Sequence, residues 1–347
     1  MAVNSNKERV AVIGAGSWGT ALAVSLAEGG HAVRLWARRE DAAESMRQER
    51  RNPGYLPEAV IPDHVEITTS LEEAVRDATT WLIAVPSQGV RAVTSEMRQW
   101  VYDGLLVVSV AKGIENGTLM TTSQVLLDVF ASLREDQVSV LYGPSHAEEV
   151  ARGTPTTVVA ASSVKATALR TQDIFMTPTL RVYVNCDMRG VEIAGSVKNV
   201  LAIAAGISDG VGYGDNAKAA ILTRGLAEIK RLGVAMGASE GTFGGLAGIG
   251  DLVVTCMSTL SRNRNLGYAI GQGQSLEQAI ASMTMVAEGV RTTSSVMELA
   301  AKLGVEMPIT SAVYSILFEG VPPEEAVHKL MMRSAKQEEW IVSQSSG

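Results

Sequence analysis

Short, unbroken apolar runs, each followed by polar or glycine-rich residues, recur through the first half of the chain. Clear examples occupy residues 10–13, 81–85 and 105–110. Apolar residues in direct succession are typical of parallel strands that are covered on both faces. Segments of helical periodicity separate these runs, which indicates an α/β domain built on a parallel sheet. Further strands are predicted at residues 32–37, 65–68, 138–141, 156–161 and 181–184.

The pattern changes near Gly190, where apolar residues begin to recur at helical spacing. We therefore expect two domains, an α/β domain at 1–189 and an all-helical domain at 190–347, with a frayed end at 343–347. Helices of the second domain are predicted at residues 192–207, 216–232, 276–281, 290–303, 310–318 and 324–331.

A glycine-rich turn follows the first apolar run and leads directly into a helical segment. Gly14, Gly16 and Gly19 form the pattern G-x-G-x-x-G, with Ser17 and Trp18 between the last two glycines. In a strand–turn–helix setting the three glycines allow a tight turn, close approach to a pyrophosphate and close packing of helix on strand. This predicts a Rossmann-type, doubly wound sheet that binds a dinucleotide.

Two arginines stand at the end of the second predicted strand. An enzyme specific for NAD usually places Asp or Glu there, whereas Arg38 and Arg39 could hold the 2′-phosphate of NADP. Glu40 and Asp41 follow at once, so a solvated charge cluster is the alternative interpretation. We expect NADP as the preferred cofactor, with NAD as the alternative.

Charge and composition limit the classes of partner. The 347 residues include 30 basic and 37 acidic side chains, a net charge of −7, so we expect no nucleic-acid partner. Cys186 and Cys256 lie far apart and are interpreted as reduced thiols, and no metal site is expected. The polar N-terminal residues do not resemble a signal peptide, and no apolar run has the length of a membrane span. We expect a cytoplasmic protein that is not embedded in a membrane.

Candidate chemistry lies at strand ends and in the helical half. Three strands end in polar or glycine-rich residues at 86–87, 111–113 and 142–149, where open α/β sheets bind ligands. Lys198 interrupts an apolar helix, so it either reaches solvent or is held inward to transfer a proton. Asp251 follows a glycine run and could be a helix cap. Residues 258–265 are interpreted as a loop that binds a phosphate ester or as a solvated basic loop.

Several motifs together resemble the bacterial NAD(P)-dependent glycerol-3-phosphate dehydrogenases. They appear in the family's order and extend from about Val10 to past Glu288. The motifs are G-A-G-S-W-G-T-A at 14–21, G-P-S at 143–145, G-S-V-K-N-V at 195–200, N-A-K-A-A at 216–220 with T-R-G at 223–225, G-I-G-D-L at 248–252 and S-R-N at 261–263.

The resemblance implies reversible hydride transfer between a nicotinamide and C2 of dihydroxyacetone phosphate. The product would be sn-glycerol 3-phosphate for phospholipid synthesis. We expect the protein to be a homodimer. Lys198 would be the proton donor and acceptor. The implied substrate-binding residues are Lys112, Gly143, Ser145, Lys198, Asp251, Ser261, Arg262 and Asn263. The implied cofactor-binding residues, together with the glycines of the turn, are Ser17, Trp18, Arg38, Arg39, Lys112, Ala147, Arg262, Val286 and Glu288.

Two other functions are compatible with the same pattern. A related two-domain dehydrogenase of the hydroxyacid or phosphogluconate type would bind a substrate carboxylate, whereas the Ser261-Arg262-Asn263 run favours a phosphate. A redox-sensing protein would bind NADPH without turning over any substrate. The resemblance leaves the role of Glu192 open.

Overall fold

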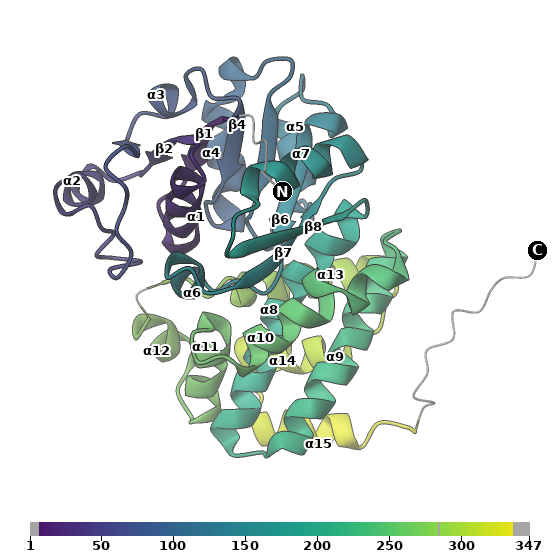
Figure 1. Ribbon diagram of the computed structural model, residues 1–347. Coiled ribbons are helices and arrows are strands. Elements are labelled where there is room, and N and C mark those ends of the chain that lie inside the picture. The colour runs from purple at the N-terminus through teal and green to yellow at the C-terminus, as the bar shows by residue number, and fades with distance from the viewer. Residues whose placement is uncertain (1–6, 284, 336–347) are drawn as a thin grey trace, which may run out of the picture.

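The structure is a computed structural model that describes residues 7–283 and 285–335. Two predictions concern residues outside this range. Most of the polar N-terminal residues that do not resemble a signal peptide lie outside the described residues, and so does the expected frayed end at 343–347. Figure 1 shows a sheet with its flanking helices in the upper half of the molecule and a helical assembly below it.

One eight-stranded sheet organises the first half of the chain, in the order β3-β2-β1-β4-β5-β6-β7-β8. Neighbouring strands are parallel except for the antiparallel pair β6 and β7. The order reverses between β1 and β4, which is the place where doubly wound sheets bind ligands. The predicted fold is therefore confirmed. The strands are β1 Arg9–Ile13, β2 Ala32–Trp36, β3 Glu66–Thr68, β4 Thr80–Ile83, β5 Leu106–Ser109, β6 Val138–Tyr142, β7 Thr156–Ala161 and β8 Leu180–Asn185.

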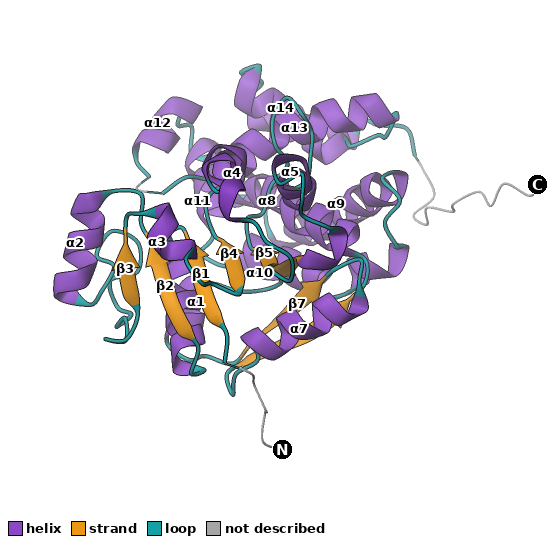
Figure 2. Ribbon diagram, turned by 90° about the horizontal axis from the view of Figure 1, so that it is seen from above, coloured by secondary structure: helices purple, strands orange, loops and turns teal. Residues whose placement is uncertain are grey.

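Helices cover both faces of this sheet, as Figure 2 shows from above. Leu22 of α1, Met46 of α2 and Phe175 of α7 share one apolar core with one face of the strands. Val90 of α4 and Leu126 of α5 belong to the core on the other face. These helices are α1 Ser17–Glu28, α2 Glu40–Glu49, α3 Leu71–Val75, α4 Val90–Glu96, α5 Thr122–Val129, α6 Ala147–Ala151 and α7 Lys165–Phe175.

The second half of the described chain is helical and is built around α8, Met188–Val211. This helix is apolar and long enough to span a membrane, so the expectation that no segment reaches that length is wrong. Its apolar stretch is entirely buried within the fold, where it shares one core with residues of α9, α10 and α13 and another with residues of α11, α12 and α14. The helices that follow α8 are α9 Asp215–Ala235, α10 Asp251–Met257, α11 Arg262–Gly271, α12 Leu276–Ala281, α13 Glu288–Leu303, α14 Pro308–Phe318 and α15 Pro323–Met331. The division into domains at residues 189 and 190 stays a prediction.

Helices α8 and α11 cross with their backbones in contact. A Cβ atom placed on Gly206 of α8 would overlap the carbonyl oxygen of Arg264 in α11. Residues four apart share one face of a helix, and each of the two helices carries two glycines at this spacing on the face that meets the other helix. The other three glycines of the crossing meet the backbone of the opposite helix in the same way: Gly210, Gly267 and Gly271.

The structure corrects the interpretation of residues 258–265 as a loop. Helix α11 begins within this run, at Arg262, and the hydroxyl of Ser261 caps it by accepting a hydrogen bond from the backbone N–H of Arg264 at 3.3 Å. Asp251, considered as a cap, is the first residue of α10 and follows a π-helical turn, Leu246–Gly250. The polar residues that open α11 hide its apolar periodicity, whereas α10 is mostly apolar and places polar Asp251 and Thr255 among its buried residues.

Candidate active site

A cleft of about 570 Å³ separates the carboxyl edge of the sheet from the helical half. The glycine turn lies at one side of it, and residues of α8, α10 and α11 lie at the other. The structure brings sixteen of the predicted site residues to this cleft: Gly14, Gly16, Ser17, Trp18, Arg38, Arg39, Lys112, Ser145, Ala147, Lys198, Asp251, Ser261, Arg262, Asn263, Val286 and Glu288.

The glycine turn has the shape that a bound dinucleotide requires. Gly14 has a φ of +120°, which L side chains rarely adopt, and a Cβ on Gly19 would overlap the carbonyl oxygen of Gly14. A Cβ on Gly16 would meet nothing within 4 Å, so open space lies above its backbone. The indole N–H of Trp18 is buried without a partner among the described residues. These features fit the pyrophosphate of NAD or NADP.

Arg38 and Arg39 differ in their surroundings. Both are exposed and line the cleft at the end of β2. The guanidinium of Arg39 lies 3.6 Å from the carboxylate of Asp41, whereas that of Arg38 has no ion pair or hydrogen bond among the described residues. Arg38 is therefore the freer of the two to hold a ligand phosphate.

Asp251 joins two lysines at the floor of the cleft. Its two carboxylate oxygens separately contact the ammonium of Lys198 and, at 2.7 Å, the ammonium of Lys112. Lys198 also donates to the hydroxyl of Thr255 at 2.6 Å, and Lys112 donates to the carbonyl of Gly143 at 3.0 Å. Lys198 is 5% exposed and Asp251 is 1% exposed, so this group is shielded from bulk water.

Burial tunes the acidity of the groups around Lys198. Desolvation lowers the pKa of the Lys198 ammonium to about 8, with the charge of Asp251 opposing that shift and that of Lys112 adding to it. An amine with such a pKa can both give and take a proton near neutral pH. Burial raises the pKa of the nearby Cys256 thiol to about 12, which keeps this thiol protonated.

The start of α11 places polar groups next to this lysine. The amide of Asn263 donates to the side-chain oxygen of Asn199 at 3.0 Å and accepts from the backbone N–H of Gly289 at 2.9 Å. These bonds connect α11 to α8 and to the first turn of α13. Arg262 is exposed and lines the cleft, with no hydrogen bond to another of the described residues. Its charge is thus available to an anionic ligand.

Glu288 closes the opposite corner of the cleft. Its carboxylate accepts a hydrogen bond of 2.8 Å from the backbone N–H of Ser87, four residues after the end of β4. Burial raises the pKa of Glu288, and the bond from Ser87 opposes the shift. The contact joins the first turn of α13 to the sheet.

Two predicted residues do not line the cleft. Gly19 lies where α1 packs on the glycine turn. Gly143 has a φ of +145°, and the backbone of Val158 occupies the space that a Cβ atom at this position would need. Gly143 still takes part in the site, because its carbonyl accepts hydrogen bonds from Lys112 and from the hydroxyl of Ser145.

Sequence reasoning missed several residues of the cleft. His146 lines it with a buried ring nitrogen, Nε2, that has no partner among the described residues. Burial and the nearby charge of Lys198 lower the pKa of His146, which favours its neutral form. Asn52 and Tyr55 also line the cleft, from a Pro- and Gly-rich loop that carried no chemical signal, and Thr255 lies one helical turn after Asp251.

The structure assigns Glu192 a place outside the cleft. This residue is 1% exposed, and its carboxylate accepts four hydrogen bonds from residues around the start of α5. The donors are the hydroxyls of Thr121, Thr122 and Ser123 and the backbone N–H of Ser123. Glu192 thus anchors α8 of the helical half to α5 on the sheet.

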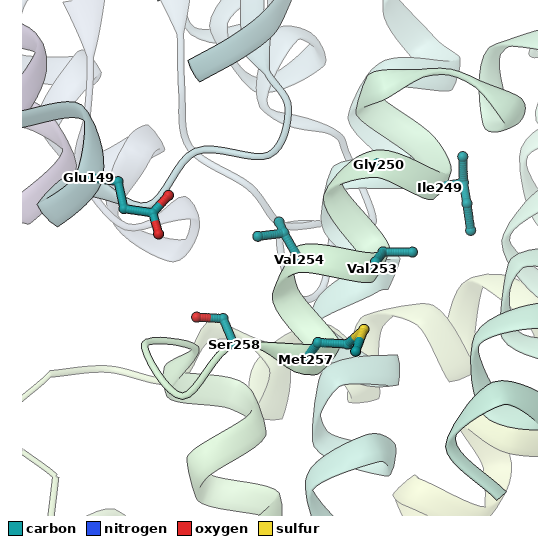
Figure 3. A pocket seen from close by; sticks show the side chains of 7 residues that line it. All are labelled: Glu149, Ile249, Gly250, Val253, Val254, Met257 and Ser258. Atoms are coloured by element: carbon teal, nitrogen blue, oxygen red, sulfur yellow. The ribbon is translucent and has the colours of Figure 1, made fainter. Parts of the chain in front are cut away.

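A second hollow lies beside the cleft, and Figure 3 shows Glu149 of α6 facing Val254 of α10 across it. It measures about 580 Å³. Its other lining residues are Ile249, Gly250, Val253, Met257 and Ser258. None of these residues is basic, so the hollow lacks the cations that a dinucleotide or a phosphate ester needs.

Comparisons with known proteins point to one family. Residues 9–168 match the model described as NAD-dependent glycerol-3-phosphate dehydrogenase N-terminus, and residues 187–328 match that of the C-terminus. The chain is 59% identical to glycerol-3-phosphate dehydrogenase NAD(P)+ 2 of Salinibacter ruber over 96% of each chain. It is 56% identical to the Prosthecochloris aestuarii enzyme, over 95% of this chain and 99% of that one. The crystal structure of glycerol-3-phosphate dehydrogenase from Coxiella burnetii superposes with a TM-score of 0.90 at 39% identity, covering 94% of this chain and 99% of that one.

Proposed function

The chain belongs to the family of NAD-dependent glycerol-3-phosphate dehydrogenases, and we propose that it interconverts dihydroxyacetone phosphate and sn-glycerol 3-phosphate with NAD(P)H. One observation carries this proposal. A buried lysine of lowered pKa, Lys198, and an exposed arginine that makes no hydrogen bond to the described residues, Arg262, line the same cleft as the glycine turn. A ketose phosphate needs both of these groups.

Lys198 is the proposed proton donor and acceptor. When bound, NAD(P)H supplies the hydride that reduces the carbonyl carbon, C2. The carbonyl oxygen gains negative charge as the hydride arrives, and the ammonium of Lys198 both stabilises that charge and gives it a proton. In the oxidative direction the neutral amine takes the hydroxyl proton. Asp251 holds Lys198 and Lys112 in place through its two carboxylate oxygens.

Arg262 and its neighbours are the proposed phosphate site. A phosphate dianion is bound best by a guanidinium and by neutral hydrogen-bond donors in fixed positions. Arg262 supplies the charge, and Ser261 and Asn263 flank it at the start of α11, where the helix dipole also favours an anion. A substrate carboxylate has fewer oxygen atoms than a phosphate to accept hydrogen bonds from these donors. This difference supports a phosphate ester over a hydroxy acid as the substrate.

The remaining parts of the proposal concern the cofactor, the assembly and the compartment. Gly14, Gly16, Ser17 and Trp18 would hold the pyrophosphate, and Arg38 would favour NADP by binding its 2′-phosphate. Ala147, Val286 and Glu288 are the other proposed cofactor contacts, and Gly143 and Ser145 the other substrate contacts. We expect a homodimer in the cytoplasm whose product serves phospholipid synthesis.

Steady-state kinetics test the proposal directly. We expect dihydroxyacetone phosphate to support NADPH oxidation far better than the oxo acids that correspond to hydroxy-acid substrates. The Lys198→Met variant should lose about a hundred-fold or more in kcat, since positioned acid–base groups contribute at least that much. Lys302→Met, an exposed position on α13, should behave like the wild type.

Two outcomes would contradict the proposal. Near-normal kcat in Lys198→Met would remove this lysine from the mechanism. Tight binding of NADPH without turnover of any ketose phosphate would instead support a redox-sensing protein.

A further inference from the structure

The loop between α2 and β3 contains a buried asparagine that reaches the glycine turn. Asn52 is 3% exposed, and its amide nitrogen donates to the backbone carbonyl of Ala15 at 2.9 Å and to the hydroxyl of Thr20 at 2.8 Å. Ala15 lies between the first two glycines of the turn, and Thr20 lies in the first turns of α1. One side chain therefore fixes both parts of the predicted pyrophosphate site.

The loop holds Asn52 firmly in this position. The backbone N–H groups of Tyr55 and Leu56 both donate to the carbonyl of Asn52, at 3.2 and 2.8 Å. Leu56 is 2% exposed and packs with Ala21 of α1 and Ala147 of α6. A second contact runs in the opposite direction, since the hydroxyl of Ser17 donates to the carbonyl of Tyr55 at 2.8 Å.

The planarity of the peptide bond transmits the effect of Asn52 to the ligand side. In a trans peptide the C=O of Ala15 and the N–H of Gly16 point in opposite directions, so an anchored carbonyl fixes the direction of the N–H. The carbonyl of Ala15 points to Asn52, and the space above Gly16 is open. The N–H of Gly16 is consequently held away from the loop before any ligand arrives.

We propose that Asn52 is a positioning residue for the dinucleotide: it holds the glycine turn in the orientation that presents backbone N–H groups to the pyrophosphate. The inference rests on the proposed function, because it requires the cleft to bind NADPH. Both partners of the amide are acceptors, so the position needs two N–H groups on one atom. A carboxylate of the same shape would instead face the carbonyl oxygen of Ala15 and repel it.

The Asn52→Asp variant tests the proposal, because it keeps the shape of the side chain and removes both donors. The Kd of NADPH, measured by quenching of tryptophan fluorescence without substrate, should rise about tenfold or more, as expected for a buried acceptor left unpaired. At saturating NADPH, both kcat and the KM of dihydroxyacetone phosphate should change less than about two-fold relative to the wild type. Asn185→Asp at the end of β8 is the matched control, since the one side-chain hydrogen bond of Asn185 within the described part of the chain is accepted by its oxygen, from the backbone N–H of Asp187.

A purely structural role would give a different result. The proposal is overturned if folded Asn52→Asp binds NADPH as the wild type does, or if the Kd of NADPH and the KM of the substrate rise together. If Asn52→Asp does not fold, Thr20→Val removes one of the two acceptors, and an unchanged NADPH Kd in that variant would overturn the proposal. A wild-type protein that oxidises NADPH with dihydroxyacetone phosphate while Asn52→Asp keeps its NADPH affinity would retain the proposed function and lose only this inference.

Discussion

Two opposing influences set the protonation of Lys198. Removal from water favours the neutral amine, whereas the adjacent carboxylate of Asp251 favours the ammonium. Desolvation is the larger influence, so the pKa falls to about 8. A lysine in water would remain charged at every physiological pH and would be a poor proton acceptor.

This pKa predicts opposite pH profiles for the two directions of the reaction. Reduction needs the ammonium, so its kcat/KM, which reports the pKa of the free enzyme, should fall as pH rises through about 8, whereas the kcat/KM of oxidation needs the neutral amine and should rise over the same range. Because Asp251 raises the pKa of Lys198, Asp251→Asn should move both breaks to lower pH. Measurement of kcat/KM against pH in both directions checks the prediction, and a shift to higher pH in Asp251→Asn would contradict it.

The cofactor preference should depend on Arg38 more than on Arg39. Arg38→Glu should shift the ratio of kcat/KM for NADPH over NADH toward NADH, because a carboxylate repels the 2′-phosphate and can bind the ribose hydroxyls. Arg39→Glu should have a smaller effect, since this arginine already faces Asp41. Equal ratios in the wild type and both variants would mean that the arginines form only a solvated charge cluster.

At the scale of the elements, a buried carboxylate joins α8 to the start of α5. Burial raises the pKa of Glu192, and the hydrogen bonds that it accepts from Ser123, Thr121 and Thr122 oppose the shift. Three of its donors are hydroxyls, which can rotate, and one is a backbone N–H, which cannot. The fixed donor decides how a substitution is tolerated.

Glu192→Ala should therefore lower the free energy of unfolding by about 2–4 kcal/mol, because it leaves a buried N–H unpaired and opens a cavity. Glu192→Gln should cost only about 1 kcal/mol, since its oxygen still accepts from Ser123 and the hydroxyls can reverse toward the amide. Urea unfolding at neutral pH measures both values, with exposed Glu298→Ala on α13 as the reference. Equal losses in Ala and Gln would show that the carboxylate charge matters more than its acceptors.

For the whole molecule, sequence reasoning predicted the sheet better than the helical half. Continuous apolar runs identify buried strands without knowledge of their neighbours, and the sheet has the predicted class of topology. Helix α11 was missed because it begins with polar residues, Arg262 among them, that line the cleft and break the apolar pattern, and α10 was considered only through Asp251 as a possible cap. The amphipathic signal of a helix weakens where one of its faces forms a binding site.

The candidate site was only partly predictable for a related reason. Lys198 stood out because a charge in an apolar helix needs an explanation, but its partner Asp251 lies 53 positions later. Asn52 carried no signal, since its role depends on contacts with a turn 37 residues earlier. Such pairings arise from the packing of distant segments, and local sequence patterns do not encode them.

The backbone contact between α8 and α11 limits how this protein can acquire a new substrate. Lys198 is carried by α8, and α11 begins at Arg262, so the crossing sets the spacing between the proposed proton donor and the proposed phosphate site. Any side chain larger than hydrogen at Gly206 or Gly267 would collide with the opposite backbone. A single substitution at the crossing therefore cannot increase the distance between Lys198 and Arg262 by a small step. Directed evolution toward a longer ketose phosphate should instead select substitutions on the sheet side of the cleft.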